Sequence, residues 1–169
     1  MALLASCGPF GTGSYFRKGI SIYTGDGTIR DTSQPTPFFG TRAFRIDLPH
    51  FRFDHPFEHT FSLTGVPVIN HTPAEIYFEV PSGLTSSEAR RTNATIEITI
   101  LNKNGIVLTH VKGPLNSFIG SGRSIYVIRH SWFQPIEKES YRMQVKFSPG
   151  SGRFEGYAHA YIECRIGGL

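Results

Sequence analysis

Apolar and polar residues alternate in many short runs of this chain, and this period of two predicts β-strands with one buried face. The clearest run spans residues 94–100, where Ile96, Ile98 and Ile100 alternate with threonine and glutamate. Runs of the same kind cover residues 44–48, 57–63, 76–80, 106–111, 124–129, 141–147 and 155–166. No long stretch has a helical period, and only residues 86–93 suit a helical turn. About eight strands at this spacing predict an all-β fold, an antiparallel β-sandwich of jelly-roll or immunoglobulin-like topology.

One connection between strands carries a strong turn signal. Asn104 and Gly105 separate two runs that are rich in β-branched residues. Asn-Gly favours a two-residue hairpin turn, in which both residues need a positive φ. We therefore expect the strands at 94–100 and 106–111 to pair as an antiparallel hairpin about these two residues.

The beginning of the chain has a different pattern. Residues 8–40 contain many glycines and prolines, with little apolar periodicity beyond residues 20–23. This composition predicts a tether with at most one short strand and a turn at 25–27. The β-sandwich is then expected over residues 41–169, and residues 1–7 form a separate N-terminal element.

Composition and charge narrow the class of protein. The 169 residues are 39% hydrophobic, which excludes a disordered chain, and two cysteines cannot form a disulfide-dense scaffold or a four-cysteine zinc site. The net charge is +4, but the basic residues are scattered, and Arg90 and Arg91 are the only adjacent pair after residue 84. Without a basic stripe we expect no nucleic-acid partner. Weak attraction to an anionic lipid surface is equally compatible with this charge.

The tetrad Leu4-Ala5-Ser6-Cys7 resembles the lipobox of bacterial lipoproteins. Small residues such as Ala5 and Ser6 fit the narrow site of a signal peptidase, and a thiol is needed to accept the lipid. The resemblance implies cleavage before Cys7, attachment of acyl chains such as palmitate to that cysteine, and residues 1–7 as the remnant of a signal. It further implies a lipid-anchored protein of the bacterial cell envelope, at the outer membrane, in the periplasm or at the cell surface.

The segment before the tetrad departs from the family pattern. A secretory signal has a basic start and an apolar stretch of ~7–15 residues. Here only Ala2, Leu3, Leu4 and Ala5 precede the last two residues of the box, and none is basic. This departure fits a start that lies upstream of Met1 or a trimmed chain. The alternative is that the tetrad is a chance match, in a frayed terminus with a free thiol.

The second cysteine has a different predicted role. Cys164 has the same phase as Ile162 and Ile166 in the last alternating run. We therefore expect it on the inward face, as a small buried hydrophobe with little reactivity. A lipid on Cys7 implies that the two cysteines do not pair.

Candidate catalytic and metal-binding residues are few. His55 and His59, near His50, have the four-residue spacing of helical metal ligands, but Pro56 lies between them. On a strand the two histidines would lie ~13 Å apart, too far for one ion. The chain has no Gly-x-Ser-x-Gly, Walker or dinucleotide-binding motif. We therefore predict no catalytic residue, no metal site and no cofactor.

Aromatic residues offer one candidate binding surface. Trp132 is the only tryptophan, and Tyr126, Tyr157 and Tyr161 lie on predicted strands. Flat rings stack on sugar faces, so these four residues are the candidate site of a carbohydrate-binding module. The alternative is that Trp132 closes one end of the sandwich core.

These observations predict a non-enzymatic, membrane-anchored envelope lipoprotein. Cys7 is the lipid attachment site, and the β-sandwich is a binding or structural module whose edges or loops meet a protein or glycan partner. The alternative function is a carbohydrate-binding β-sandwich module that uses Trp132 and exposed tyrosines.

Overall fold

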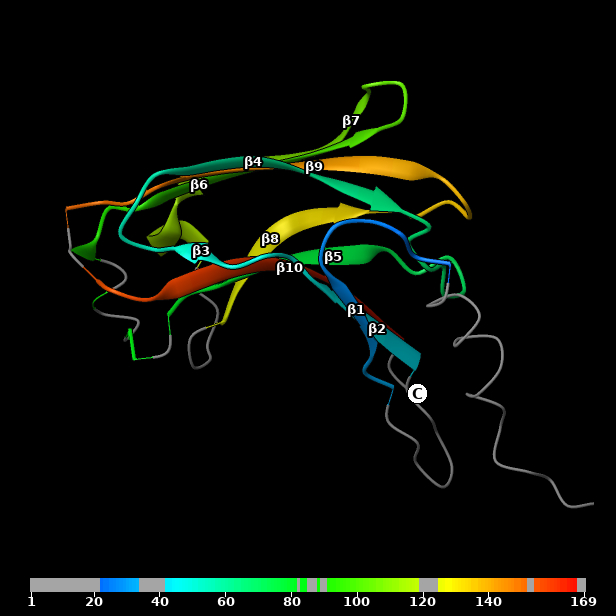
Figure 1. The fold of residues 1–169 in the computed structure, drawn as a ribbon, viewed down its shortest axis with the longest axis horizontal. Helices are drawn as coiled ribbons and strands as arrows, with labels where there is room; N and C mark the ends of the chain where they lie inside the picture. The colour runs from blue at the N-terminus through cyan, green and yellow to red at the C-terminus, as the bar shows by residue number, and fades with distance from the viewer. Residues whose placement is uncertain are drawn as a thin grey trace, which may run out of the picture.

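The computed structural model describes residues 22–33, 42–81, 83–84, 88, 91–118, 125–151 and 154–166, with the backbone alone at 42, 116, 118 and 125–130. Two antiparallel sheets pack face to face (Figure 1), which confirms the predicted β-sandwich. The strands are β1 (Thr28–Asp31), β2 (Arg42–Asp47), β3 (Phe51–Arg52), β4 (Phe57–Thr64), β5 (Ala74–Glu79), β6 (Thr95–Asn102), β7 (Val107–Pro114), β8 (Ile125–Phe133), β9 (Ser140–Ser148) and β10 (Tyr157–Ile166). A short 3-10 helix, η1 (Leu115–Phe118), follows β7. Within these ranges no helix has the length and apolar character that crossing a bilayer requires.

The strand order is that of a jelly roll. One sheet has the order β1-β2-β10-β5-β8, with β3 also paired to β10, and the other has the order β4-β9-β6-β7. Starting from the β6–β7 hairpin, β5 pairs with β8, β4 with β9, and β2 with β10. A long double strand folded back at one hairpin and wrapped into two sheets is a jelly roll. Of the two topologies that the sequence left open, the structure has this one.

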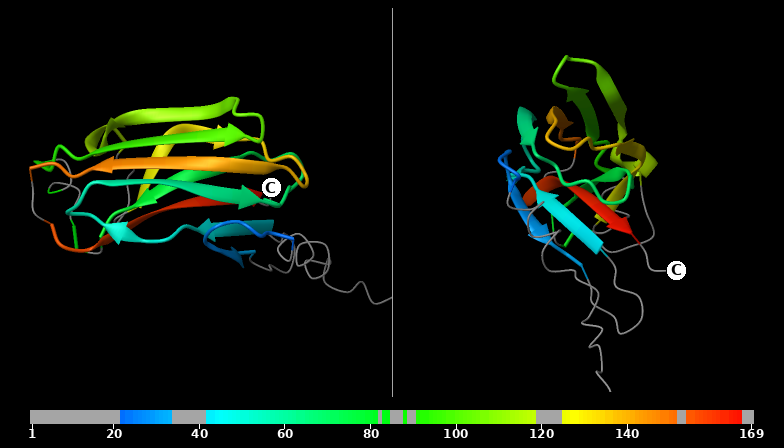
Figure 2. Two further views of the ribbon diagram at one scale, coloured as in Figure 1. Left: turned by 45° about the horizontal axis from the view of Figure 1, so that its top comes forward. Right: turned by 90° about the vertical axis from the view of Figure 1, so that its right-hand side faces the viewer.

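The core lies between the two sheets and follows the alternation in the sequence. Ile96, Ile98 and Ile100 on β6 are at most 1% exposed, as are Met143 and Val145 on the neighbouring β9. Two views of the ribbon show the sheets stacked as separate layers (Figure 2). Burying an aliphatic side chain of this size stabilises the fold by about 1.5–3 kcal/mol, so the alternating runs supply much of its stability.

Strand β10 lies between β2 and β5 in the sheet, and its residues 158–162 are buried on both faces. Its inward residues include Cys164, which is 1% exposed, unpaired and packed in the core. Burial raises the pKa of this thiol to about 11. The burial of Cys164 confirms its predicted inward position, and the raised pKa keeps its thiol protonated at neutral pH. The outward residues His159 and Tyr161 are also buried, at 7% and 2% exposure.

The part of the predicted tether that the structure describes, residues 22–33, contains bends at 25–27 and one short strand and lies against the sandwich. Thr28–Asp31 form β1 and pair with β2, in register from Thr28 opposite Asp47. Just before this strand, the backbone N–H of Asp26 donates to the Ser62 carbonyl at 2.7 Å, and its carboxylate accepts from the Ser62 N–H at 2.6 Å. This part of the chain therefore covers the edge of β4 and belongs to the sandwich. Residues 1–21 and 34–41 lie outside the described residues.

The β6–β7 hairpin forms where Asn104 and Gly105 predict it, but with a different turn. Gly105 has a φ of 79°, whereas Asn104 is not among the residues with positive φ. The Gly105 N–H donates to the Asn102 carbonyl at 3.0 Å, and the Asn102 N–H donates to the Ile106 carbonyl at 3.0 Å. This is a type I turn followed by a left-handed glycine, the usual three-residue hairpin loop. The side-chain oxygen of Asn102 also accepts from the Ile106 N–H at 2.9 Å.

The turn type makes a testable distinction between Asn104 and Gly105. We expect Gly105→Ala to lower the free energy of unfolding by about 1–2 kcal/mol, because a Cβ disfavours the left-handed conformation. Asn104→Ala should change it by less than about 0.5 kcal/mol, since its position in a type I turn accepts most residues. Urea denaturation of both variants measures this. Equal losses at the two positions would indicate the two-residue turn instead.

Candidate functional site

A network of charged and aromatic side chains covers the outer face of the larger sheet. The guanidinium carbon of Arg45 on β2 lies 3.5 Å from the centre of the Tyr161 ring on β10. The ring of Tyr77 on β5 stacks on the same tyrosine, with centroids 4.8 Å apart and planes within 1°. The three side chains thus form one stack across three adjacent strands. Each pair is a cross-strand contact of the kind that stabilises sheets.

Arg45 also connects this stack to a cluster of ionisable groups. Its Nε atom lies 2.5 Å from Asp47, and one terminal nitrogen lies 3.3 Å from Glu79. The same terminal nitrogen lies 3.1 Å from Nε2 of His159. The His159 ring in turn stacks on His50, with centroids 4.3 Å apart. These partners satisfy one another, so the cluster connects β2, β5 and β10 and presents no free reactive group among the residues named here.

Burial sets the protonation of this cluster. The pKa of His159 is lowered, first by burial and then by the neighbouring His50. The pKa of Tyr161 is raised to about 12, chiefly by burial. At neutral pH the imidazole is therefore neutral and accepts a hydrogen bond from Arg45, while the phenol keeps its proton. The Nε2 lone pair of His159 is therefore engaged by Arg45, and the Tyr161 phenol is not ionised.

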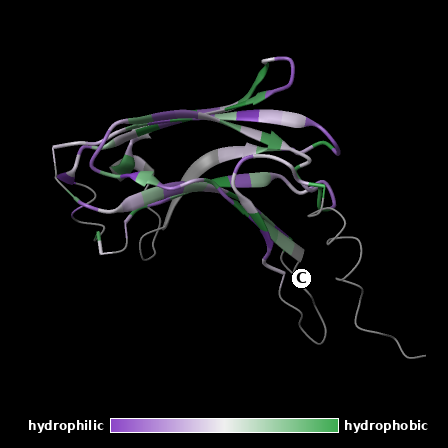
Figure 3. Cartoon of the chain, in the orientation of Figure 1, coloured by the Kyte–Doolittle hydropathy of each residue, from purple (hydrophilic) through white to green (hydrophobic). Residues whose placement is uncertain are grey.

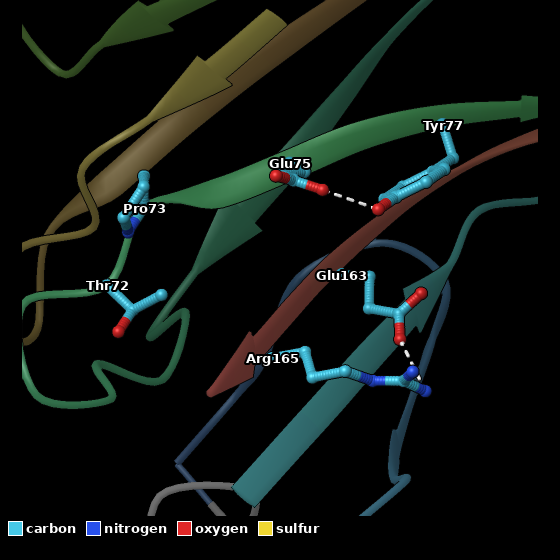
Figure 4. A pocket seen from close by; sticks show the side chains of 6 residues that line it. All are labelled: Thr72, Pro73, Glu75, Tyr77, Glu163 and Arg165. Atoms are coloured by element: carbon cyan, nitrogen blue, oxygen red, sulfur yellow. Dashed lines mark hydrogen bonds and ion pairs between the residues drawn. The ribbon is translucent and has the colours of Figure 1, made fainter. Parts of the chain in front are cut away.

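A polar groove of about 300 Å³ lies beside the stack (Figure 4). Its lining residues are Thr72, Pro73, Glu75, Tyr77, Glu163 and Arg165. Glu75 and Glu163 are directly opposite each other on β5 and β10. Each carboxylate already has a partner, because the Tyr77 hydroxyl donates to Glu75 and Arg165 lies 3.4 Å from Glu163. The groove is therefore polar, with its charges paired internally.

A second, apolar groove of about 410 Å³ lies between β7 and the end of β8. It is lined by Leu108, Thr109, Trp132, Phe133, Gln134 and Ile136. The indole of Trp132 is 53% exposed, and Leu108 and Ile136 are 41% and 59% exposed. The Thr109 hydroxyl donates to the Trp132 carbonyl at 2.7 Å and holds the two strands together. Exposed apolar side chains around a groove are typical of an interaction surface.

The predicted aromatic platform is not one surface. Tyr161 is buried with its ring covered by Tyr77 and Arg45, so its assignment as a sugar-stacking residue is wrong. Trp132 and Tyr157 are both exposed, so the alternative that Trp132 closes the core is also wrong. Trp132 on β8 is opposite Glu75 on β5, which in turn is opposite Glu163 on β10. Tyr157 lies six residues before Glu163 on β10, which at ~3.3 Å per residue is about 20 Å along the strand from the level of Trp132. The side chain of Tyr126 and the whole of Cys7 lie outside the described residues.

The histidines near the start of β4 are not gathered into one site. His50 stacks on His159, His55 lies 2.8 Å from Asp54, and His59 contacts the ring of Phe61. Among the described residues, no group of three or more histidine, cysteine, aspartate or glutamate side chains could hold a metal ion.

The sequence interpretation missed the Arg45 network. Arg45 and Asp47 are visible as the polar positions of one alternating run, and His159 and Tyr161 as those of another. The two runs are more than a hundred residues apart along the chain, and only the pairing of β2 with β10 brings them together. Alternation along each strand assigns the face of the sheet but not the neighbouring strand.

Comparison with known proteins adds little to this description. No family model matches the chain, and no curated protein is similar to it in sequence. Two solved structures with some similarity are infectious bursal disease virus of the Gx strain and the VP2 subviral particle of that virus. Their TM-scores are 0.32 and 0.29 at 11% and 10% identity, over 83% of this chain and 37% and 38% of theirs. Similarity this low bears on neither the fold nor the function of the chain.

The lowered pKa of His159 predicts how stability depends on pH. Below about pH 6.5 the unfolded histidine takes up a proton, while the folded one does so only at lower pH. The free energy of unfolding should therefore fall as the pH falls below about 6.5, and His159→Gln should show a flatter profile. Urea denaturation between pH 5 and 8 measures this, with exposed His59→Gln as the control. A steeper or unchanged profile in His159→Gln would contradict the buried neutral state.

Proposed function

We propose that the chain is a non-enzymatic lipoprotein of the bacterial cell envelope, with acyl chains on Cys7 and the jelly roll as its binding or structural module. The lipobox-like tetrad Leu4-Ala5-Ser6-Cys7 supports the anchor. The observation that carries the proposal is that the other cysteine, Cys164, is unpaired and buried in the core. Cys164 is therefore not a disulfide partner of Cys7, which supports a role for Cys7 as the lipid acceptor.

The described polar side chains favour a binding or structural role over catalysis. Arg45 and His159 pair with neighbouring groups of the sheet, and so do the carboxylates of Glu75 and Glu163 that line the polar groove. A catalytic site needs a nucleophile or a general base directed at a space where a substrate could sit. Of the two grooves described above, the one at Trp132 is bordered by exposed apolar side chains, which suits recognition by contact.

Mass spectrometry of the mature protein tests the anchor. Expressed in a bacterium together with the coding region upstream of Met1, the protein should carry acyl chains on an N-terminal Cys7. Cys7→Ser should remain unmodified, and Cys164→Ala should be acylated like the original chain. An unmodified Cys7 thiol with residues 1–6 still attached would refute the lipoprotein proposal.

A second candidate function is carbohydrate binding, and the exposure of Trp132 favours it. The indole is 53% exposed and borders a groove that also contains the polar groups of Thr109 and Gln134. A flat exposed ring with adjacent hydrogen-bonding groups suits the face of a sugar.

Because Trp132 is the only tryptophan, its fluorescence reports on this candidate directly. A bound polysaccharide should shift the emission of the indole and protect it from quenching by acrylamide. Binding measured by affinity electrophoresis should be lost in Trp132→Ala and retained in Tyr157→Ala, whose ring lies at the other end of the sheet. An unchanged emission across a panel of cell-wall glycans would remove this candidate.

A further inference from the structure

Exposed apolar side chains are concentrated at one end of the jelly roll. Eight large apolar side chains are exposed in the described part of the chain, and seven of them lie at this end: Ile22, Val68, Ile106, Val107, Leu108, Trp132 and Ile136. The eighth, Tyr157, lies at the opposite end, at the start of β10. We call these seven residues, together with the connections after β4, β6 and β8, the loop end. It is at the right of Figure 1, where β4, β6 and β8 finish.

Three connections and the entering chain meet at the loop end. A Cβ at Gly65, after β4, would lie 2.6 Å from the carbonyl oxygen of Ile22, so these segments touch. The Gly65 N–H donates to the Glu139 carbonyl at 3.3 Å, which joins the β4–β5 and β8–β9 connections. Lys103 in the β6–β7 hairpin lies 2.8 Å from the carboxylate of Glu139. The seven side chains are therefore carried by neighbouring segments.

The jelly-roll topology explains why these segments share one end. Successive strands of the roll run in opposite directions, so the connections after β4, β6 and β8 fall at one end. The connections after β5, β7 and β9 fall at the other. Apolar residues in several connections of the first end form one surface, although they are far apart in the sequence. Figure 3 shows the apolar start of β7 directly beside the polar turn of its hairpin.

We propose that the loop end inserts its apolar side chains into the interface of a phospholipid bilayer, so that the jelly roll rests on the membrane by this end. Ile106, Val107 and Ile136 are 53–59% exposed, and aliphatic side chains of this kind gain free energy on leaving water. Trp132 adds an amphipathic ring of the type that settles at the level of lipid headgroups. This inference rests on the proposed lipid anchor, which brings the bilayer close.

The position of Ile22 argues for a bilayer as the occupant. Ile22 is fifteen residues after Cys7, and at most ~3.6 Å per residue keeps the lipid-bearing residue within about 54 Å of the loop end. The described chain enters the sandwich at this end, since Ile22 contacts Gly65. A membrane that holds Cys7 therefore reaches the loop end without the chain passing along the domain. A protein partner or a second copy has no comparable link to this surface.

The charges of the loop end indicate insertion rather than electrostatic attraction. Lys103 and Lys138 are offset by Glu137 and Glu139 in the same two connections, and the Arg142 guanidinium beside Gly105 leaves only a small positive excess. A surface without a clear excess of positive charge gains little from anionic lipids. We therefore expect binding to depend weakly on salt and on the headgroup charge.

The test separates the loop end from the lipid anchor by using the full chain with Cys7→Ser. Vesicles of phosphatidylethanolamine and phosphatidylglycerol should shift the emission of Trp132 to shorter wavelength and sediment the protein with the lipid. Phosphatidylcholine vesicles should do the same. The double variant Ile106→Ser with Ile136→Ser should lower the partition coefficient by about tenfold or more, because burial of each isoleucine is lost. Both positions are exposed, so the fold should tolerate the changes.

Tyr157→Ser is the matched control, because it removes an equally exposed apolar side chain at the opposite end. Its partition coefficient should equal that of the Cys7→Ser parent. No sedimentation and no emission shift would overturn the inference. So would binding restricted to anionic vesicles and lost in high salt, or a dimer that Ile106→Ser with Ile136→Ser converts to a monomer. If the original chain is acylated on Cys7 but the Cys7→Ser variant does not bind vesicles, the inference about the loop end is refuted and the lipoprotein proposal stands.

Discussion

The structure depends on the pairing of its strands about the β6–β7 hairpin. From that turn outward, β5 meets β8, β4 meets β9 and β2 meets β10, so each half of the chain needs the other to complete its sheets. Gly105 permits the turn by adopting a positive φ, and Asn102 holds it through its side chain. Because the strands alternate in direction, the connections divide into two sets at opposite ends. The composition of one set can then differ from that of the other without disturbing the core.

The same pairing places β10 between β2 and β5, where residues 158–162 of β10 are buried on both faces of the sheet. The outward residues His159 and Tyr161 are buried, and buried polar groups are costly unless they have partners. Tyr161 is stacked between Tyr77 and Arg45, and His159 accepts a hydrogen bond from the same arginine. This network therefore stabilises the sheet, and the exposed apolar surface lies elsewhere, at the loop end.

Much of the fold could be predicted from the sequence, since alternation reveals each strand and its inward face directly. The inward phase of Cys164 and the hairpin at Gly105 were both confirmed. The short strands β1 and β3 were missed, because four and two residues are too few to show a period. The Arg45 network and the loop end were also missed, since both join residues that are distant in sequence. Single-strand patterns could not show that Tyr161 would be covered by the strands on either side.

A lipid on Cys7 and insertion of the loop end would leave the opposite end of the jelly roll, with Tyr157, facing away from the membrane. Hydrogen–deuterium exchange on the lipidated protein, with and without its bilayer, tests this orientation most directly. We expect slower exchange on the membrane at residues 65–72, 103–108 and 134–139, which lie in the connections after β4, β6 and β8 and at the start of β7. Exchange at residues 52–56 and 154–157 should be unchanged. Protection at the opposite end, or equal exchange at both ends, would contradict this orientation.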